Sequence, residues 1–151
     1  MNKNIDNPLI SIVCMTYNHA AKIRHALDGF LKQKTNFPYE ICLGEDGSTD
    51  GTKEICHEYL EKNSDKIRLF ERSRNDVIFI ENQPTGRFNF IETLKESRGK
   101  YIAICDGDDY WTDPYKLQKQ IDFLKNNNEY SMVHTNYSNL KNGIIKDKPG
   151  K

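Results

Sequence analysis

The sequence lacks a long hydrophobic run and a net charge, and each absence excludes a class of protein. Its longest apolar runs have the length of a strand, too short to span a membrane, and its first residues lack the apolar core of a signal peptide. The formal net charge is +0, from 22 basic and 22 acidic residues, so no broad cationic field is present to gather nucleic acid or anionic lipid. We therefore expect a cytoplasmic protein with no transmembrane segment and no nucleic-acid partner.

Cysteine is also scarce, and its spacing excludes a metal finger. None of the four cysteines forms a CxxC pair: Cys14, Cys42 and Cys105 fall in predicted buried strands and Cys56 in a predicted helix. We expect free, buried thiols. What remains, 151 residues that are 36% hydrophobic and 29% charged, suits one domain with a sizeable core.

Strand-like and helix-like segments alternate along the chain. Runs of β-branched and small apolar residues predict buried strands, and apolar residues at helical spacing predict helices. The expected strands are 9–15, 39–44, 67–70, 101–105 and 130–135, the expected helices are 20–34, 50–63, 87–97 and 115–126, and 76–80 is either strand or loop. Ser48 or Thr49 is the expected N-cap of the second helix. The alternation predicts an α/β fold, a mostly parallel Rossmann-like sheet flanked by helices, in a single domain over 1–151 with an irregular tail over 139–151.

The strongest single feature is the acidic stretch Asp106-Gly107-Asp108-Asp109, which directly follows a predicted buried strand. Open α/β sheets bind ligands beyond the carboxyl ends of such strands. Neighbouring carboxylates repel one another unless a divalent metal or a basic ligand offsets their charge. Gly107 would let the backbone approach a phosphate closely. The stretch therefore predicts a site for a metal-bound diphosphate.

Two further strand ends carry polar groups, and parallel strands bring all three ends to one edge of the sheet. Thr16-Tyr17-Asn18 ends the first predicted strand and Glu45-Asp46-Gly47-Ser48 the second. Tyr17 can stack on a base, a carboxylate at Asp46 can accept an imide or amide N–H, and Asp108 can hold a cation. Mn²⁺ or Mg²⁺ suits such a site, because these hard cations take one or two protein carboxylates and complete their shell with phosphate oxygens and water. Together the three ends predict a nucleotide-diphosphate pocket.

These motifs resemble the GT-A glycosyltransferases, especially the inverting family 2 group, over nearly the whole chain. The segment 8–13 with Thr16-Tyr17-Asn18 is similar to the opening strand and nucleotide loop of that family, 45–52 to its second motif, and 99–102 leading into Asp106-Gly107-Asp108 to its DXD strand. The resemblance implies a nucleotide-diphospho-sugar-binding fold and the transfer of a sugar, typically from a UDP-sugar, to a hydroxyl of a saccharide or lipid-linked acceptor.

The resemblance also implies roles for individual residues. Tyr17 and Asp46 would contact the base, usually uracil, Asp108 would bind the metal, and Asp106 would face the nucleoside or the outer shell of the metal. Arg87 stands where relatives often place a basic or polar group near the nucleotide. The extension 109–114 is similar to a subgroup among bacterial surface-polysaccharide transferases. Such an enzyme would act beside a membrane, so we expect peripheral association of the intact protein with the inner face.

Two departures from the family pattern matter. Glu45 replaces the usual first aspartate of the second motif, which changes the reach of the carboxylate. The catalytic base of the family, an aspartate or glutamate in a later acidic motif, has no counterpart in this chain. We therefore expect the donor-binding portion of a longer enzyme, truncated at the C-terminus, with its base beyond Lys151.

Other interpretations stay open at this point. Asp46-Gly47 is also a common turn dipeptide, and the acidic stretch could cap the next helix. A haloacid-dehalogenase-like phosphatase also places Asp-x-Asp after a buried strand, but normally near the N-terminus. A sugar-nucleotide pyrophosphorylase would need a Gly-rich, Arg-containing loop after the first strand, which is absent here. A non-catalytic nucleotide-sugar-binding module is the remaining alternative. We expect His19, His25 and His57 on exposed helical faces, without ligand spacing.

Overall fold

A four-stranded parallel sheet in the order β3-β2-β1-β6 forms the centre of the fold. The computed structural model describes residues 7–141 and 144–147. Its strands are β1 (Ile10–Thr16), β2 (Tyr39–Glu45), β3 (Ile67–Glu71), β4 (Ile78–Ile80), β5 (Gln83–Thr85), β6 (Tyr101–Ile104), β7 (Ser138–Lys141) and β8 (Ile144–Asp147). The helices are α1 (Ile23–Leu31), α2 (Thr52–Lys62), the short 3₁₀ helix η1 (Arg74–Asp76), α3 (Arg87–Lys95) and α4 (Lys116–Asn126). None of the helices within the described ranges is long and apolar enough to cross a membrane.

The two central strands are buried on both faces, as their apolar runs predict. Every residue of β2 is buried, and in β1 only Met15 is half-exposed. The two strands pair in parallel from Ile10 opposite Tyr39 to Thr16 opposite Glu45. This register matters for the site, because it makes β1 and β2 end at the same level.

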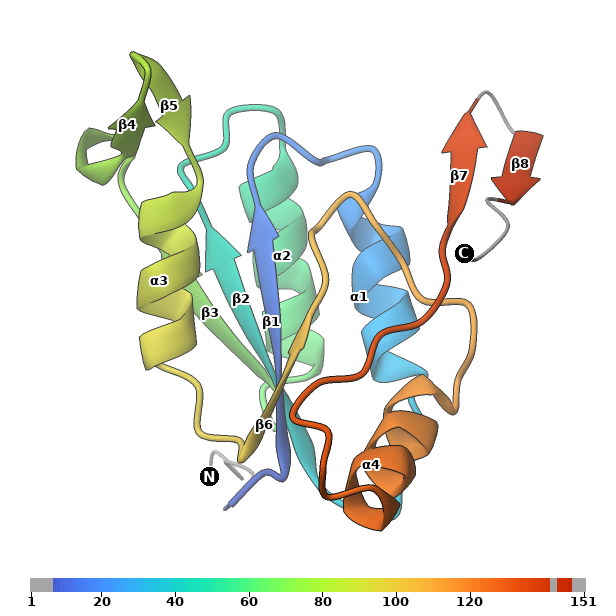
Figure 1. Cartoon of the computed structure of the whole chain (residues 1–151). Helices are drawn as coiled ribbons and strands as arrows, with labels where there is room; N and C mark the ends of the chain where they lie inside the picture. Colours follow the sequence, from blue (N-terminus) through green and yellow to red (C-terminus); the bar gives the residue numbers. More distant parts are fainter. Residues whose placement is uncertain (1–6, 142–143, 148–151) are drawn as a thin grey trace. The chain divides into compact units, whose positions relative to one another are not determined.

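Helices cover both faces of the sheet (Figure 1). In the view of Figure 1, α3 lies in front of the sheet, against β1 and β2, while α1 and α2 lie behind it. The helix α1 buries Ile23, Leu27 and Phe30, whose helical spacing marks the apolar face of this helix in the sequence. All four cysteines are free and buried, and burial raises the pKa of the Cys105 thiol to about 12. The predicted α/β fold with a mostly parallel sheet is confirmed.

One charged side chain lies inside this sheet. Glu40 in β2 is 1% exposed, and it accepts hydrogen bonds from the Ser11 hydroxyl at 2.7 Å and from the Arg98 guanidinium at 2.6 and 2.9 Å. Its Oε2 also pairs with Arg68 at 3.4 Å. Because a buried charge is tolerated only when it is paired and hydrogen-bonded, Ser11, Arg68 and Arg98 explain how a glutamate fits in the core.

Several elements differ from the sequence predictions at their ends. Helix α1 begins at Ile23 rather than near residue 20, because the His19 carbonyl accepts the N–H groups of Lys22 and Ile23 in a preceding turn. The turn also means that His19 is half-buried in a loop instead of lying on an exposed helical face. The predicted caps of α2 are wrong: the N-cap position is held by Gly51 rather than Ser48 or Thr49, and the Asp50 carboxylate accepts the backbone N–H of Thr52 at 3.0 Å. The ambiguous segment 76–80 contains β4, which pairs with β5 as an antiparallel hairpin.

The chain groups into two compact units, one through Leu117 and one from Gln118 onward. In the second unit the predicted strand over 130–135 does not form: Met132 is 78% exposed, and these residues have no partner strand in the described part of the chain. The predicted irregular tail contains instead the hairpin β7–β8, with Ser138 opposite Asp147. An Asn-Gly dipeptide between two strand-like runs is a strong hairpin signal, and the prediction overlooked it. Residues 142–143 and 148–151 of that tail lie outside the described residues.

Candidate functional site

The polar ends of β1, β2 and β6 meet at one edge of the sheet, as the sequence predicts. The backbone N–H of Asp46 donates to the carbonyl of Thr16 at 3.0 Å, and the backbone N–H of Gly107 donates to the carbonyl of Met15 at 2.8 Å. These bonds continue the strand pairing beyond β2 and β6, so each loop leaves the sheet beside β1. Figure 1 shows β1, β2 and β6 rising to this edge, where α3 also begins.

The loops after β1 and β2 are hydrogen-bonded to each other. The backbone N–H of Asn18 donates to Ser48 Oγ at 2.9 Å, and Asn18 Oδ1 accepts the backbone N–H of Thr49 at 2.9 Å. The Asp50 carboxylate accepts the backbone N–H of Ala20 at 3.0 Å. Asn18 adopts the left-handed conformation, with φ 54°, which asparagine tolerates better than most residues. The amide oxygen of Asn18 therefore holds the loops in register rather than facing outward.

Glu45, the departure from the family pattern, has a structural role in this geometry. Its side chain is almost fully buried and accepts the backbone N–H of Gly47 at 3.1 Å and that of Ser48 at 2.7 Å. Gly47 has φ +75°, a conformation that side chains other than glycine rarely adopt. The Glu45 carboxylate thus fixes the turn that follows Asp46, and both of its oxygens are used in doing so.

Asp46 pairs with an arginine that the sequence predictions did not include. Its carboxylate is 3% exposed and forms an ion pair with the guanidinium of Arg74, which belongs to η1. The same guanidinium lies over the ring of Tyr17, with its Cζ 4.2 Å from the ring centroid. Burial raises the pKa of the Asp46 carboxyl above its ordinary value, and Arg74 opposes that shift. A planar cation, a buried carboxylate and an aromatic ring form one cluster at the strand ends.

The acidic loop supplies the second part of the site. Asp106, Asp108 and Asp109 lie within one turn, in which the Asp109 N–H donates to the Asp106 carbonyl at 3.1 Å. Although Asp106 reaches solvent, desolvation of its carboxyl raises its pKa, and the negative charges of Asp108 and Asp109 raise it further. Asp108 Oδ2 lies 3.6 Å from Lys22 Nζ in an exposed ion pair. The loop therefore places three carboxylates close together, and the nearby Lys22 offsets only part of their negative charge.

Two buried polar atoms beside this loop lack a hydrogen-bond partner within the described residues. They are Thr16 Oγ1 and His19 Nδ1. A Cβ added at Gly107 would lie 2.8 Å from that threonine hydroxyl, so only glycine leaves the space in front of it open. Because buried polar groups are nearly always hydrogen-bonded, these two atoms suit a water molecule or a polar group of a ligand.

The donor set fits a divalent metal that is shared with a ligand. Within residues 7–141 and 144–147, no group of three or more His, Cys, Asp or Glu side chains is arranged to hold a metal ion by itself. Asp106 and Asp108 offer two carboxylates, and Mg²⁺ or Mn²⁺ commonly binds one or two carboxylates together with phosphate oxygens. These carboxylates suit a metal–diphosphate complex better than an isolated ion.

Arg87 is the first residue of α3 and is exposed, at the edge of the sheet where that helix begins. The structure places it on the same side of the fold as the strand ends (Figure 1). Arg72 is a further basic residue that the sequence predictions missed: its backbone N–H donates to the Glu45 carbonyl at 2.8 Å. Arg72 does not stand out in the sequence, because a single basic residue in a loop has no distinctive spacing.

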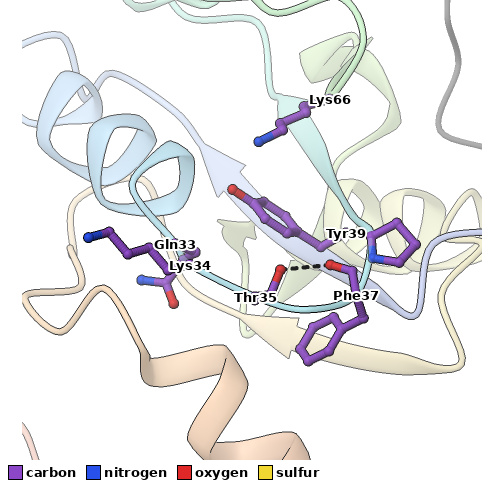
Figure 2. Close-up of a pocket in the computed structure, with 7 residues that line it drawn as sticks. Gln33, Lys34, Thr35, Phe37, Tyr39 and Lys66 are labelled. Atoms are coloured by element: carbon purple, nitrogen blue, oxygen red, sulfur yellow. Dashed lines mark hydrogen bonds between the residues drawn. The ribbon is translucent and has the colours of Figure 1, made fainter.

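Two open surface pockets lie away from these residues. A cavity of about 420 Å³ lies between α1 and the start of β2, with Gln33, Lys34 and Lys66 among its lining residues (Figure 2). A second cavity of about 330 Å³ lies beside α1 and includes Tyr110 and Trp111. Neither includes a residue predicted for the nucleotide site. We base the site on the strand-end cluster, because convergent charge and unsatisfied polar atoms indicate ligand chemistry more directly than volume does.

Comparison with known families agrees with this geometry. The sequence model described as "Glycosyl transferase family 2" matches residues 11–148. The chain belongs to glycosyltransferase family 2. The Mycobacterium tuberculosis protein Rv1520 is 43% identical to this family 2 domain over 115 residues, which is 76% of the chain and 31% of Rv1520. The Bacillus subtilis protein TuaG, named as a teichuronic acid biosynthesis glycosyltransferase, is 30% identical over 117 residues, 78% of the chain and 42% of TuaG.

Solved structures show the same GT-A fold. The mannosyltransferase PcManGT from Pyrobaculum calidifontis, in complex with GDP-Man and Mn²⁺, superimposes with a TM-score of 0.64 at 22% identity, over 80% of this chain and 33% of PcManGT. S. aureus TarS 1–349, in complex with UDP, gives a TM-score of 0.59 at 25% identity, over 79% of this chain and 32% of that one. The family 2 domain thus spans between 31% and 42% of the length of these relatives. The predicted family and fold are both confirmed.

Proposed function

We propose that this family 2 domain binds the nucleotide-sugar donor of a metal-dependent, inverting glycosyltransferase. The observation that carries the proposal is the convergence of the Tyr17–Asp46 pair and the Asp106–Asp108 loop on one sheet edge, joined to β1 by backbone hydrogen bonds. A base-sized planar site beside an acidic, metal-suited loop matches the two halves of a nucleoside diphosphate. The donor would be a UDP-sugar, and the acceptor a hydroxyl of a saccharide or lipid-linked glycan in bacterial surface-polysaccharide synthesis.

The base and ribose would bind at the ends of β1 and β2. Tyr17, 40% exposed, offers a ring face for stacking, and the Asp46 carboxylate would accept the N3–H of uracil. Thr16, at the end of β1, has a buried hydroxyl without a hydrogen-bond partner among the described residues. Asn18 would act through the backbone of its loop, since its amide oxygen already binds Thr49.

The diphosphate would bind over the acidic loop and the start of α3. Asp108 would be the direct metal ligand and Asp106 would bind the metal or the nucleoside, while the backbone of Gly107 allows close approach of the phosphates. When bound, Mn²⁺ or Mg²⁺ would neutralise the charge of the departing diphosphate. Arg87, exposed at the first turn of α3, would contact the phosphates from the other side.

In the complete reaction, a deprotonated acceptor hydroxyl would attack the anomeric carbon from the side opposite the leaving diphosphate. The carboxylates around the described site are unsuited to that deprotonation, because Glu45 fixes a turn, Asp46 pairs with Arg74, and the acidic loop lies on the donor side. We therefore assign none of these carboxylates as the general base. Since the groups identified among the described residues are suited to the donor only, a non-catalytic nucleotide-sugar-binding module is the second candidate.

Calorimetric titration with UDP tests the proposal. We expect binding in the presence of Mn²⁺ that is lost in excess chelator and is strongly weakened in Asp108→Asn. The matched control is Asp109→Asn, which removes a neighbouring charge of the same loop that has no assigned ligand role. Equal affinity with and without metal, or metal-dependent affinity that survives in Asp108→Asn, would contradict the assignment.

A further inference from the structure

The guanidinium of Arg74 makes both contacts that the proposed function assigns to the nucleotide base. It pairs with the buried carboxylate of Asp46, and it lies over the ring of Tyr17 at 4.2 Å from the centroid. A guanidinium is flat, carries N–H donors at its edge and stacks on aromatic rings. Uracil shares these properties, with a flat ring and an N–H donor at its edge.

The two contacts together fix where a flat group must lie. A base that stacks on the same ring face and donates an N–H to the carboxylate has to occupy the space that the guanidinium fills. Asp46 is buried, with 4% of its side chain exposed, so its carboxylate can be approached only over a narrow range of directions. Two flat groups cannot occupy this position at once.

We propose that Arg74 is an internal occupant of the base pocket, which a nucleotide base must displace in order to bind. The proposal rests on the proposed function, since it takes Tyr17 and Asp46 as the base site. It assigns Arg74 a role as a determinant of donor affinity: the pocket is closed by a side chain of the domain until a base with a suitable N–H replaces that side chain.

The surroundings of Arg74 allow such a movement. Arg74 begins η1, a single turn of three residues, whose preceding Ser73 accepts the N–H of Asn75 at 3.2 Å. Its side chain is 28% exposed, so one side of it already faces solvent. A Cβ added at Gly47 would lie 3.1 Å from Arg74 Cγ, so the glycine makes room for the stem of the arginine. When Arg74 leaves the pocket, the Asp46 carboxylate still accepts a hydrogen bond, because the N–H of the base replaces the N–H of the arginine.

An arginine that stays in place and donates to a base carbonyl would have the opposite effect on affinity. If Arg74 competes with the base, the observed Kd equals the intrinsic Kd divided by the fraction of molecules whose pocket is open. If Arg74 occupies the pocket in about nine-tenths of the molecules, removing its side chain lowers the Kd about tenfold. If Arg74 assists binding, removing it raises the Kd. The sign of the change therefore decides between the two roles.

Uridine is the appropriate probe, because it has no phosphates and does not respond to the lost positive charge as UDP would. We expect Arg74→Ala to bind uridine at least about fivefold more tightly than the parent, as measured by calorimetry at pH 8. Arg74→Lys keeps the charge but not the flat group, so its Kd for uridine should lie between those of the parent and Arg74→Ala. The matched control is Lys62→Ala, a lost positive charge at the far end of α2, which should leave the Kd unchanged.

A second measurement covers the case in which Arg74→Ala disturbs the loop. In the parent protein, the side-chain Nε–H resonance of Arg74 should shift on saturation with uridine, because the guanidinium leaves both Asp46 and Tyr17. In an Asp46→Ala background, Arg74→Ala should increase the affinity for uridine by less, since the ion pair that holds the Arg74 side chain in the pocket is already absent.

The outcomes separate the two proposals. If the parent binds uridine and Arg74→Ala binds it with equal or lower affinity, the displacement is overturned and the proposed function stands. An Arg74 resonance that does not move at saturation with uridine has the same consequence. Absence of uridine and UDP binding in the parent and in Arg74→Ala alike overturns the proposed function, and the displacement with it.

Discussion

Gly107 lies directly against Thr16. A Cβ added at Gly107 would come within 2.8 Å of Thr16 Oγ1 and 2.9 Å of Ile23 Cδ1, distances that real Cβ atoms do not show. The backbone N–H of Gly107 also donates to the Met15 carbonyl at 2.8 Å. The acidic loop is therefore held against the end of β1 by a hydrogen bond and by the absence of a side chain. Its carboxylates owe their place at the sheet edge to this contact.

The first prediction concerns that contact. Gly107→Ala should push the acidic loop away from β1, because the methyl group has no space, and overpacking of this kind costs about 1–3 kcal/mol of stability. Mn²⁺-dependent UDP affinity should fall about tenfold or more, since the carboxylates move relative to Asp46. Urea unfolding and calorimetry measure the two effects. Gly86→Ala is the control, because a Cβ there meets nothing within 4 Å. Unchanged UDP affinity in Gly107→Ala would show that the close approach is unimportant for binding.

The centre of the sheet was predictable from the sequence, because β1 and β2 are buried on both faces. A strand such as β1 or β2 then consists almost entirely of apolar residues, which a half-exposed segment does not show. The segment 130–135 looked similar but has no partner strand among the described residues, and a strand needs a partner as well as a suitable composition. Helix ends were less predictable, because they depend on local hydrogen bonds, such as those that Asp50 accepts from Ala20 and Thr52.

The placement of the candidate site residues was predictable where it depends on strand ends and not where it depends on contacts between distant loops. Asp46 follows the buried strand β2, and Gly107 follows β6, which is apolar but exposes Ile102 and Ile104 instead of being buried as predicted. The common edge of the two loops follows from parallel pairing alone. Arg74 is 28 residues from Asp46 in the chain and lies in a loop of varied composition. Nothing in its neighbourhood indicates that it stacks on Tyr17, because that contact arises only once η1 is placed beside the ends of β1 and β2.

The second prediction concerns base choice. Asp46→Ala should weaken uridine diphosphate binding by about 1.5–3 kcal/mol, because it removes a charged acceptor of the uracil N3–H. The parent should prefer uridine over adenosine diphosphate, since adenine offers an acceptor at the corresponding ring nitrogen and would face the carboxylate unfavourably. Competition titrations at fixed Mn²⁺ measure both quantities. If Asp46→Ala keeps the affinity of the parent for uridine diphosphate, or if the parent prefers adenosine diphosphate, the Asp46 carboxylate does not determine base recognition.

The third prediction concerns the buried glutamate of β2. Glu40→Gln should lower the free energy of unfolding by about 3–5 kcal/mol, because it leaves Arg98 and Arg68 without their buried partner. Chemical denaturation followed by far-UV circular dichroism measures the change. Glu61→Gln is the control, since Glu61 is exposed on α2 and its loss should matter little. Equal stability of the two variants would mean that the buried pair contributes nothing net to folding.

The fourth prediction concerns acid stability. Burial pushes the pKa of Glu40 upward, but hydrogen bonds from Arg98 and Ser11 outweigh burial and hold the pKa below its ordinary value. A carboxyl with a depressed folded pKa stabilises the fold above the unfolded pKa of about 4.3, and the contribution is lost as the pH falls through the folded value. The stability difference between the parent and Glu40→Gln should therefore be constant near neutral pH and shrink below about pH 4. A difference that grows with acidity would reverse the assigned sign.

The last prediction concerns catalysis by residues Met1–Lys151. If the groups on the three strand ends hold the donor as proposed, they are engaged on the side of the leaving diphosphate, whereas the acceptor hydroxyl must be deprotonated on the far side of the anomeric carbon. Asp46 is held by Arg74 and Asp108 pairs with Lys22 at 3.6 Å, both on the donor side. We therefore expect this chain to bind a UDP-sugar with Mn²⁺ and to hydrolyse it slowly at most, without transferring the sugar. Chromatographic product analysis with several UDP-sugars and saccharide acceptors measures both reactions, with Asp108→Asn as the control for metal-dependent turnover. Sustained, metal-dependent transfer by this chain alone would show that the general base lies within it, and the carboxylates of the acidic loop would then have to be reconsidered as bases.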